Sequence, residues 1–203
     1  MRVLVACEES QVVASAFRMA GHEAYSCDLL PCSGGHPEWH LQQDVMPLLD
    51  KNWDMVIAHP PCTYISKAGA RWMYPNGNLS HERMFQAQCG KAFFIMFWEY
   101  LDCPRICIEN PTPLKAVGLP EPTQVIQPYM FGEPYSKRTL LWLKGLPPLI
   151  ATDVVLDHTP WMPSNTSGYS RGGGGSHGVA HDQRTASRTF PGIAKAMAEQ
   201  WGR

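Results

Sequence analysis

The chain has 203 residues, 44% hydrophobic and 17% charged, which suits a single α/β domain with its own core. No apolar run approaches the roughly 18 residues of a membrane span, and Glu8 and Glu9 come too early for a signal peptide, so no membrane association is expected. Seven cysteines without regular spacing argue against a disulfide framework and favour a reducing cytoplasm, bacterial or of a phage-infected host.

The net charge of −1 is unevenly distributed along the chain. Residues 1–102 carry 7 Lys and Arg against 11 Asp and Glu, whereas residues 103–203 carry 10 against 7. A phosphate backbone responds to local potential rather than to the sum over the whole chain. If the protein binds nucleic acid, we expect the second half to supply most of the attraction.

The first 28 residues have the pattern of a nucleotide-binding βαβ unit. Arg2–Ala6 is an apolar run typical of a central parallel strand. Ser10 is the predicted N-cap of a helix that ends at Gly21, and a second strand over Glu23–Cys27 leads to Asp28. The apolar face of the helix comprises Val12, Val13, Ala16, Phe17 and Ala20. The order strand, helix, strand, acid predicts a nucleotide site.

The middle of the chain alternates strands and helices again. Met55–Ala58 is a predicted strand that runs into His59–Cys62, and residues 63–79 are expected to form a loop. Ser80 is the predicted N-cap of a long helix that reaches about Leu101. Its expected buried stripe is Phe85, Ala92, Phe93, Met96 and Phe97.

Three further strands are predicted, over Arg105–Glu109, Val125–Gln127 and Thr139–Leu143, the last two flanking a turn at residues 132–134. From Leu146 to Arg188 the periodicity disappears, and a final helix follows Pro191 with Ile193, Ala194, Met197 and Trp201 at helical spacing. We therefore expect an α/β fold with a mostly parallel sheet and helices on both faces. The expected parts are a core over 1–145, an irregular segment over 146–188 and a helix within 189–203 that packs back on the core.

Pro-Pro-Cys at a strand end is the strongest local signal for chemistry. Ligands of open parallel sheets bind beyond the carboxyl ends of the strands, and two prolines stiffen the backbone that carries Cys62. A thiolate there can act as a nucleophile. The alternative is that Cys62 is a small buried hydrophobic residue, the usual environment of a free cysteine.

Glu109 ends another predicted strand, in Ile-Cys-Ile-Glu-Asn-Pro. A carboxyl group at the same sheet edge as a cysteine can hold a pyrimidine by N3 and the exocyclic amine. Protonation at N3 makes carbon 6 open to a thiolate, after which carbon 5 can accept a methyl group. The alternative for Glu109 is an acid at the protein surface.

The ordered set of motifs resembles the cytosine-5 DNA methyltransferases, in particular a short form found in phages and prophages. The set comprises strand–helix–acid, Pro-Pro-Cys, Glu-Asn-Pro, then residues 127–139 and 141–148, and the likeness extends from Val3 to Trp201 except for residues 151–186. The resemblance implies a Rossmann-like class I S-adenosylmethionine-dependent methyltransferase fold. It also implies duplex DNA as the partner, with the target cytosine flipped out of the stack.

The resemblance implies a role for each matching residue. Cys62 attacks carbon 6, and Glu109 holds N3 and the amine. Lys137 and Thr139 stand where the family usually has two arginines that contact the base, its phosphate or the catalytic loop. For S-adenosylmethionine, Asp28 is expected at the ribose and Asp44 at the adenine amine. The other expected cofactor residues are Cys7, Glu8, Ser10, Leu29, Pro60 and Lys195, and no metal is expected.

Three departures from the family pattern affect these expectations. The first turn, Cys7–Gln11, has no glycine, so the approach of the backbone to the cofactor differs. Thr139 replaces an arginine. Only Leu146–Arg188 is available for target recognition, which predicts a short or relaxed sequence preference. Within it, the predicted nucleic-acid contacts are Arg171, Arg184 and Arg188, with His158, His177 and His181 in support. Outside it, they are Lys67, Arg71 and Arg138.

Several alternatives stay open at this point. The substrate could be RNA or a cytidine nucleotide, and the chain could be a catalytically silent nucleic-acid-binding module. An adenine amino-methyltransferase fits less well, because those enzymes have an aromatic residue where this chain has Cys62. Lys195 could favour a carboxylated cofactor and hence carboxymethyl transfer. A spacing of Cys27, Cys32, His36 and His40 allows structural zinc as a minor alternative.

Overall fold

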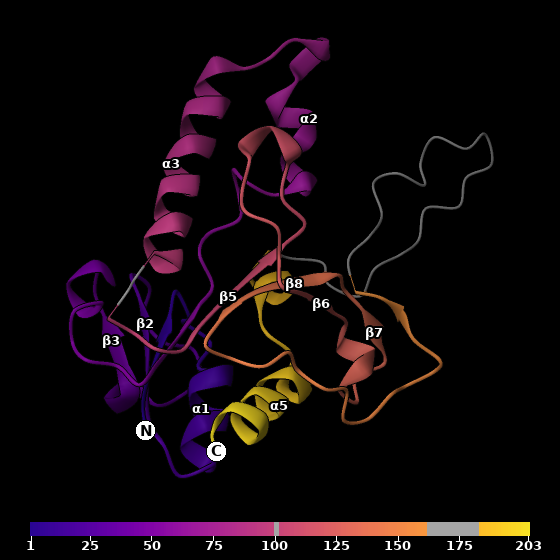
Figure 1. Cartoon of the computed structure of the whole chain (residues 1–203). Helices are drawn as coiled ribbons and strands as arrows, with labels where there is room; N and C mark the ends of the chain where they lie inside the picture. Colours follow the sequence, from indigo (N-terminus) through magenta and orange to yellow (C-terminus); the bar gives the residue numbers. More distant parts are fainter. Residues whose placement is uncertain (100–101, 162–182) are drawn as a thin grey trace.

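The computed structural model describes residues 1–99, 102–161 and 183–203. Seven of its strands form one sheet, in the order β3-β2-β1-β4-β5-β8-β6 (Figure 1). These strands are β1 Arg2–Ala6, β2 Glu23–Asp28, β3 His40–Gln42, β4 Met55–Ala58, β5 Ile106–Pro111, β6 Gln124–Ile126 and β8 Thr139–Lys144. A second, two-stranded sheet pairs β7 (Tyr135–Ser136) with β9 (Thr159–Pro160).

The sheet is parallel from β3 to β5, and β8 runs antiparallel between β5 and β6. A doubly wound sheet with one reversed strand inserted near its edge is the arrangement of the Rossmann-like class I methyltransferase fold. The predicted fold class is therefore confirmed. All predicted strands lie within one or two residues of the observed ones, as the apolar runs of parallel strands allow.

Helices cover both faces of the sheet. α1 (Val12–Met19) and α5 (Pro191–Trp201) lie side by side on one face, where Phe17 and Met197 join a core with Val3 and Val5 of β1 (Figure 1). α3 (His81–Trp98) covers the other face. There, the buried residues Phe94 and Phe97 share a core with Leu4. None of the helices in the described ranges is long and apolar enough to cross a membrane.

The remaining helices are short. α2 spans Ala70–Met73 and α4 spans Gln183–Ser187. The 3-10 turns are Pro37–Trp39, Met46–Leu48, Lys67–Gly69, Pro75–Gly77, Lys115–Val117 and Pro128–Met130. Residues 63–79, expected as a loop, therefore contain α2 and two of these turns. α2 and the first turns of α3 stand away from the sheet (Figure 1).

Two details of the predicted helices are wrong. Ser10 is not the N-cap of α1; the N-cap is Gln11, without a side-chain hydrogen bond to the helix. In α3, Ser80 is the N-cap as predicted and accepts from the Arg83 N–H, but the buried stripe differs. Phe85 is 69% exposed and Met96 47% exposed. Ala87 and Phe94 are buried in their place, because apolar residues surround most of this helix and its period does not single out one face.

Candidate active site

The Pro-Pro-Cys and Glu-Asn-Pro segments lie side by side at the carboxyl edge of the sheet. β4 pairs in parallel with β5, with Ala58 opposite Ile108, so the next residues along, His59 and Glu109, emerge next to each other. The Asn110 side chain donates from Nδ2 to the Pro60 carbonyl at 2.7 Å, and Asn110 is buried. This hydrogen bond ties the segment that carries Cys62 to the end of the strand that carries Glu109.

A tight turn fixes the backbone at Cys62. The Cys62 carbonyl accepts from the N–H groups of Ile65 at 3.2 Å and Ser66 at 2.9 Å. The chain beyond this turn is joined to the segment after β5, because the Leu114 N–H donates to the Ile65 carbonyl at 2.8 Å. The Cys62 side chain is half-buried. Burial raises the pKa of its thiol, and the nearby charge of Glu109 raises it further.

His59 and Glu109 form a largely buried pair, with His59 Nδ1 3.0 Å from Glu109 Oε2. Burial opposes ionisation of Glu109, but the hydrogen bond to His59 and the charges of Lys137 and His59 outweigh it and lower the Glu109 pKa. Burial likewise opposes the charge on His59, but the bond to Glu109 and the charges of Glu109 and Glu8 raise the His59 pKa. Both directions favour an imidazolium–carboxylate pair that holds one proton.

Lys137 belongs to the same electrostatic cluster. Its charge lowers the pKa of both Glu109 and Cys62. Thr139, expected to contact the base, is buried at the start of β8, and its hydroxyl donates to the Lys137 carbonyl at 3.1 Å. This bond fixes the backbone of Lys137. Arg138, between the two, is exposed.

Three of the predicted cofactor residues, Cys7, Asp28 and Asp44, lie at the other half of the same edge. Cys7 follows β1 and Asp28 ends β2. Burial raises the pKa of Cys7, and the charges of Asp28 and Asp44 contribute, so these three residues are neighbours although they come from separate segments. Asp28 and Asp44 each accept one hydrogen bond, from the N–H of Leu30 at 2.9 Å and of Met46 at 3.0 Å. Leu29, beside Asp28, is 72% exposed.

The first turn reaches its shape without glycine. Cys7 and Gln11 take the left-handed conformation, with φ of 59° and 60°, where glycine is the usual residue. Gln11 is fully buried, and its amide donates to the His36 carbonyl at 2.8 Å and accepts from the His36 N–H at 3.0 Å. A Cβ on Gly34 would lie 2.6 Å from the Ser10 carbonyl oxygen, so residues 33–36 need a glycine there to pack on the turn.

Glu8 takes over the capping function expected of Ser10. Its carboxylate accepts from the N–H groups of Val13 at 2.7 Å and Ala14 at 3.2 Å, the open amides of the first turn of α1. Burial raises the pKa of Glu8, and the charge of His59 and these hydrogen bonds partly offset it. Glu8 therefore lies between the cofactor half and His59, and both its oxygens are engaged by the protein.

Lys195 lies on the solvent side of α5. Its Nζ is 3.8 Å from Oε1 of Glu199, which lies one turn further along α5. The cofactor contact expected for Lys195, and the carboxymethyl-transfer alternative built on it, stay predictions.

The predicted nucleic-acid contacts are dispersed. Lys67 and Arg71 are exposed near Cys62, on the 3-10 turn and on α2. Arg188 donates from Nη2 to Ser33 Oγ at 3.0 Å, which brings the end of the irregular segment onto the cofactor half. Arg171, His177 and His181 lie outside the described residues, and so does the side chain of Arg184, whose backbone is in α4.

In the described part of the chain, no three His, Cys, Asp or Glu side chains are grouped as a metal site requires. Both ring nitrogens of His40, from the zinc-like spacing, have protein partners instead. Nδ1 lies 2.9 Å from Ser26 Oγ, and Nε2 lies 2.9 Å from the Leu30 carbonyl oxygen. Burial, as the largest cause, raises the pKa of Cys27 to about 11.

Sequence reasoning overlooked two residues of this site. His59 stands directly before the proline pair, and its position after β4 could have been read as a site position by the same argument that selected Cys62. The hydrogen bond between His59 and Glu109 could not have been predicted, because it depends on the register of β4 against β5. Asn110 was visible only as part of the Glu-Asn-Pro motif, and its bond to Pro60 follows from the three-dimensional arrangement.

No protein-family model and no curated protein sequence matches the chain. Among solved structures, it is similar to a mutant of DNMT2 from Spodoptera frugiperda, with 14% identity and a TM-score of 0.39 over 80% of this chain and 55% of that one. It is also similar to the methyltransferase EhMeth of Entamoeba histolytica, with 11% identity and a TM-score of 0.46 over 76% and 57%. The chain thus spans little more than half the length of each.

Proposed function

We propose that the protein is an S-adenosylmethionine-dependent methyltransferase that acts on carbon 5 of a cytosine flipped out of duplex DNA, with Cys62 as the nucleophile. The observation that carries the proposal is the joining of the two motif segments at one sheet edge. Asn110 ties Pro60 to β5, and the charge of Glu109 reaches both Lys137 and Cys62. For methyl transfer to carbon 5, a pyrimidine ring needs a nucleophile at one edge and a carboxyl group at the other.

The residues of the cofactor half fit a nucleoside with a cationic centre. Asp28 and Asp44 each use one carboxylate oxygen on a backbone N–H, which leaves the other for a ribose diol and an adenine amine. Exposed Leu29 offers an apolar contact to the adenine face. S-adenosylmethionine, if held by these residues, would supply an electrophilic methyl group for carbon 5.

In the proposed reaction the Cys62 thiol loses its proton to solvent, and its sulfur forms a bond to carbon 6. The charge of Lys137 favours the thiolate, whereas burial and Glu109 oppose it. The proton that the His59 imidazolium holds passes through Glu109 to N3 as the sulfur bonds to carbon 6, which draws electrons from that carbon, and it returns to the pair when the ring is restored. Carbon 5 would take the methyl group as its bond to the sulfonium sulfur breaks, with S-adenosylhomocysteine as the leaving group. The carbon 5 proton then passes to water, the bond between the Cys62 sulfur and carbon 6 breaks, and the ring is restored.

The same geometry serves RNA or a free cytidine nucleotide, so the test compares substrates in parallel. Labelled methyl transfer from S-adenosylmethionine is measured on duplex DNA, single-stranded DNA, RNA and dCMP, with Cys62→Ser as the inactive control. We expect duplex DNA to be the best substrate. Preferred transfer to RNA or dCMP would contradict the DNA assignment, and no transfer to any of them would favour a silent binding module.

A further inference from the structure

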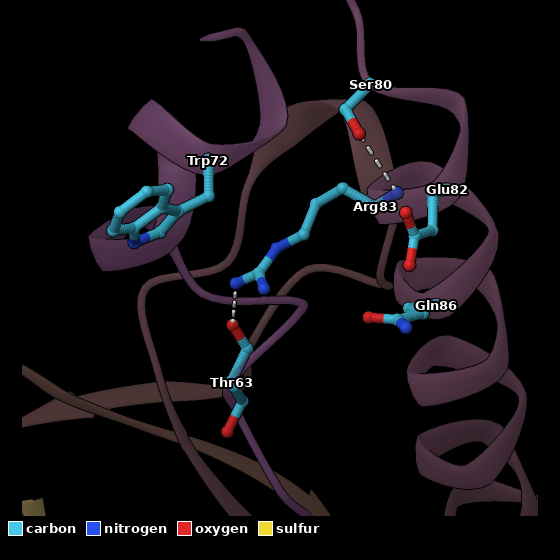
Figure 2. A pocket seen from close by; sticks show the side chains of 6 residues that line it. All are labelled: Thr63, Trp72, Ser80, Glu82, Arg83 and Gln86. Atoms are coloured by element: carbon cyan, nitrogen blue, oxygen red, sulfur yellow. Dashed lines mark hydrogen bonds between the residues drawn. The ribbon is translucent and has the colours of Figure 1, made fainter.

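A hollow of about 370 Å³ opens between α2 and α3, next to the nucleophile. Figure 2 shows the Trp72 indole on one side and side chains of α3 on the other, with the Arg83 side chain between them. The lining residues are Thr63, Trp72, Ser80, Glu82, Arg83 and Gln86. No role in the proposed methyl transfer uses any of them.

The hollow is fixed to the turn at Cys62. Arg83 donates from Nη2 to the carbonyl of Thr63, the residue after Cys62, at 2.7 Å (Figure 2). The same guanidinium lies 4.4 Å from the centroid of the Tyr64 ring. A ligand in the hollow is therefore held at a set position relative to the sulfur.

The lining combines an aromatic surface with hydrogen-bonding groups of both kinds. Trp72 is 57% exposed, and the Arg71 guanidinium lies 4.6 Å from its ring. The Gln86 amide can donate and accept, and the Glu82 carboxylate can accept from an amino group. A planar ring with donors and acceptors on its edge matches this set.

The surroundings suit the backbone that carries such a ring. Residues 63–91 contain four Lys or Arg residues and a single acid, in a chain whose net charge is −1. Positive potential around a base-sized hollow is typical of proteins that bind an unpaired nucleotide, where stacking on an aromatic side chain supplies affinity.

We propose that this hollow holds an unpaired nucleobase of the DNA that carries the target cytosine, stacked on Trp72 and read by Gln86. The inference rests on the proposed function and extends it by a second base site. The base comes either from the position opposite the flipped cytosine or from one of its two neighbours on the same strand. In either case the hollow supplies part of the sequence preference that a separate recognition domain supplies in longer enzymes.

The test measures duplex binding by the whole protein, with an abasic position opposite the target, on its 5′ side or on its 3′ side. We expect one of the three duplexes to bind the wild type about tenfold more weakly than the intact duplex, the effect of one lost stack. Trp72→Ala should bind the intact duplex about tenfold more weakly than the wild type does, and it should bind that abasic duplex no more weakly than the intact one. Trp72→Phe should keep most of the wild-type affinity for the intact duplex. Gln86→Ala should lose the preference among bases at that position.

Two exposed residues of α3 outside the hollow give matched controls, Gln88→Ala and Phe85→Ala, which should bind as the wild type does. If Trp72→Ala weakens binding to all the duplexes equally, or does not weaken binding at all, the proposed base site is wrong even though the protein methylates DNA. If the wild type methylates no DNA, the proposed function fails first and the base site with it. Circular dichroism on each variant separates these outcomes from loss of folding.

Discussion

Glu109, near the carboxyl end of β5, and Asp28, the last residue of β2, belong to the same sheet, yet their carboxylates are held in opposite ways. Glu109 is largely buried, bonded to His59 at 3.0 Å and within the field of Lys137. Asp28 is half-buried and accepts one hydrogen bond, from a backbone N–H two residues further on. Asp44, which follows β3, resembles Asp28 in accepting one hydrogen bond from a backbone N–H two residues further on, that of Met46.

Under the proposed function, this contrast separates a carboxylate that acts on the substrate ring from one that binds the cofactor. A buried carboxylate that already has charged partners keeps its orientation before any ligand arrives, which suits a group that acts on a reacting ring. An acid with a free oxygen near solvent loses little when it exchanges water for a ligand hydroxyl, which suits reversible binding. Substitutions in the two halves should therefore affect different kinetic constants.

The largest effect is expected for Glu109→Gln. The amide cannot pass a proton to N3, so kcat should fall by about 10²–10⁴-fold, while the affinity for S-adenosylmethionine stays unchanged. Single-turnover methyl transfer and cofactor binding are measured side by side. The exposed acid Glu121 provides the control, as Glu121→Gln. If Glu109→Gln lowered only the affinity for S-adenosylmethionine and left kcat unchanged, the proposed role of Glu109 in the chemical step would be contradicted.

The next largest effect is expected for Asp28→Asn. Loss of charge-assisted bonds to the ribose should raise the Kd for S-adenosylmethionine by roughly 10–100-fold, with a smaller change in kcat at saturation. Isothermal titration gives the Kd directly, and the exposed Asp50→Asn is the matched control. An unchanged Kd would mean that the cofactor lies elsewhere.

A change in pH dependence is expected for His59→Asn. In the wild type the shared proton is held up to the raised pKa of His59, so kcat/KM should fall as the pH rises through that value. The variant must keep the proton on Glu109 alone, so the decline should move to lower pH and the rate at neutral pH should drop about tenfold. A purely structural role for His59 would lower the rate at all pH values without moving the decline.

The smallest effect concerns stability rather than catalysis. Glu8→Ala removes the acceptor for two amides of α1 and should cost about 1–3 kcal/mol of unfolding free energy. Ser10→Ala should cost less than about 0.5 kcal/mol, since Ser10 is not the N-cap. Urea unfolding compares the two variants. An equal loss of unfolding free energy in the two variants would contradict the assignment of the capping role to Glu8.

The fold and the placement of the Pro-Pro-Cys and Glu-Asn-Pro segments at one sheet edge could be predicted, because both depend on where strands end. Short apolar runs mark parallel strands, and their carboxyl ends share an edge whatever the details of packing. The His59–Glu109 pair could not be predicted, since it needs the register of two strands 50 residues apart in the chain. The buried face of α3 was mispredicted for another reason: Phe85 and Phe94 are equally apolar, and only the packed sheet selects between them.

The most direct measurement is covalent trapping on duplex DNA that contains 5-fluorodeoxycytidine, in the presence of S-adenosylmethionine. Fluorine at carbon 5 blocks the proton loss that releases the enzyme, so the sulfur–carbon bond should persist. We predict a denaturation-resistant complex with the wild type and with the exposed-thiol variant Cys89→Ser, and none with Cys62→Ser. A complex with Cys62→Ser, or none with a wild type that methylates carbon 5, would contradict the account.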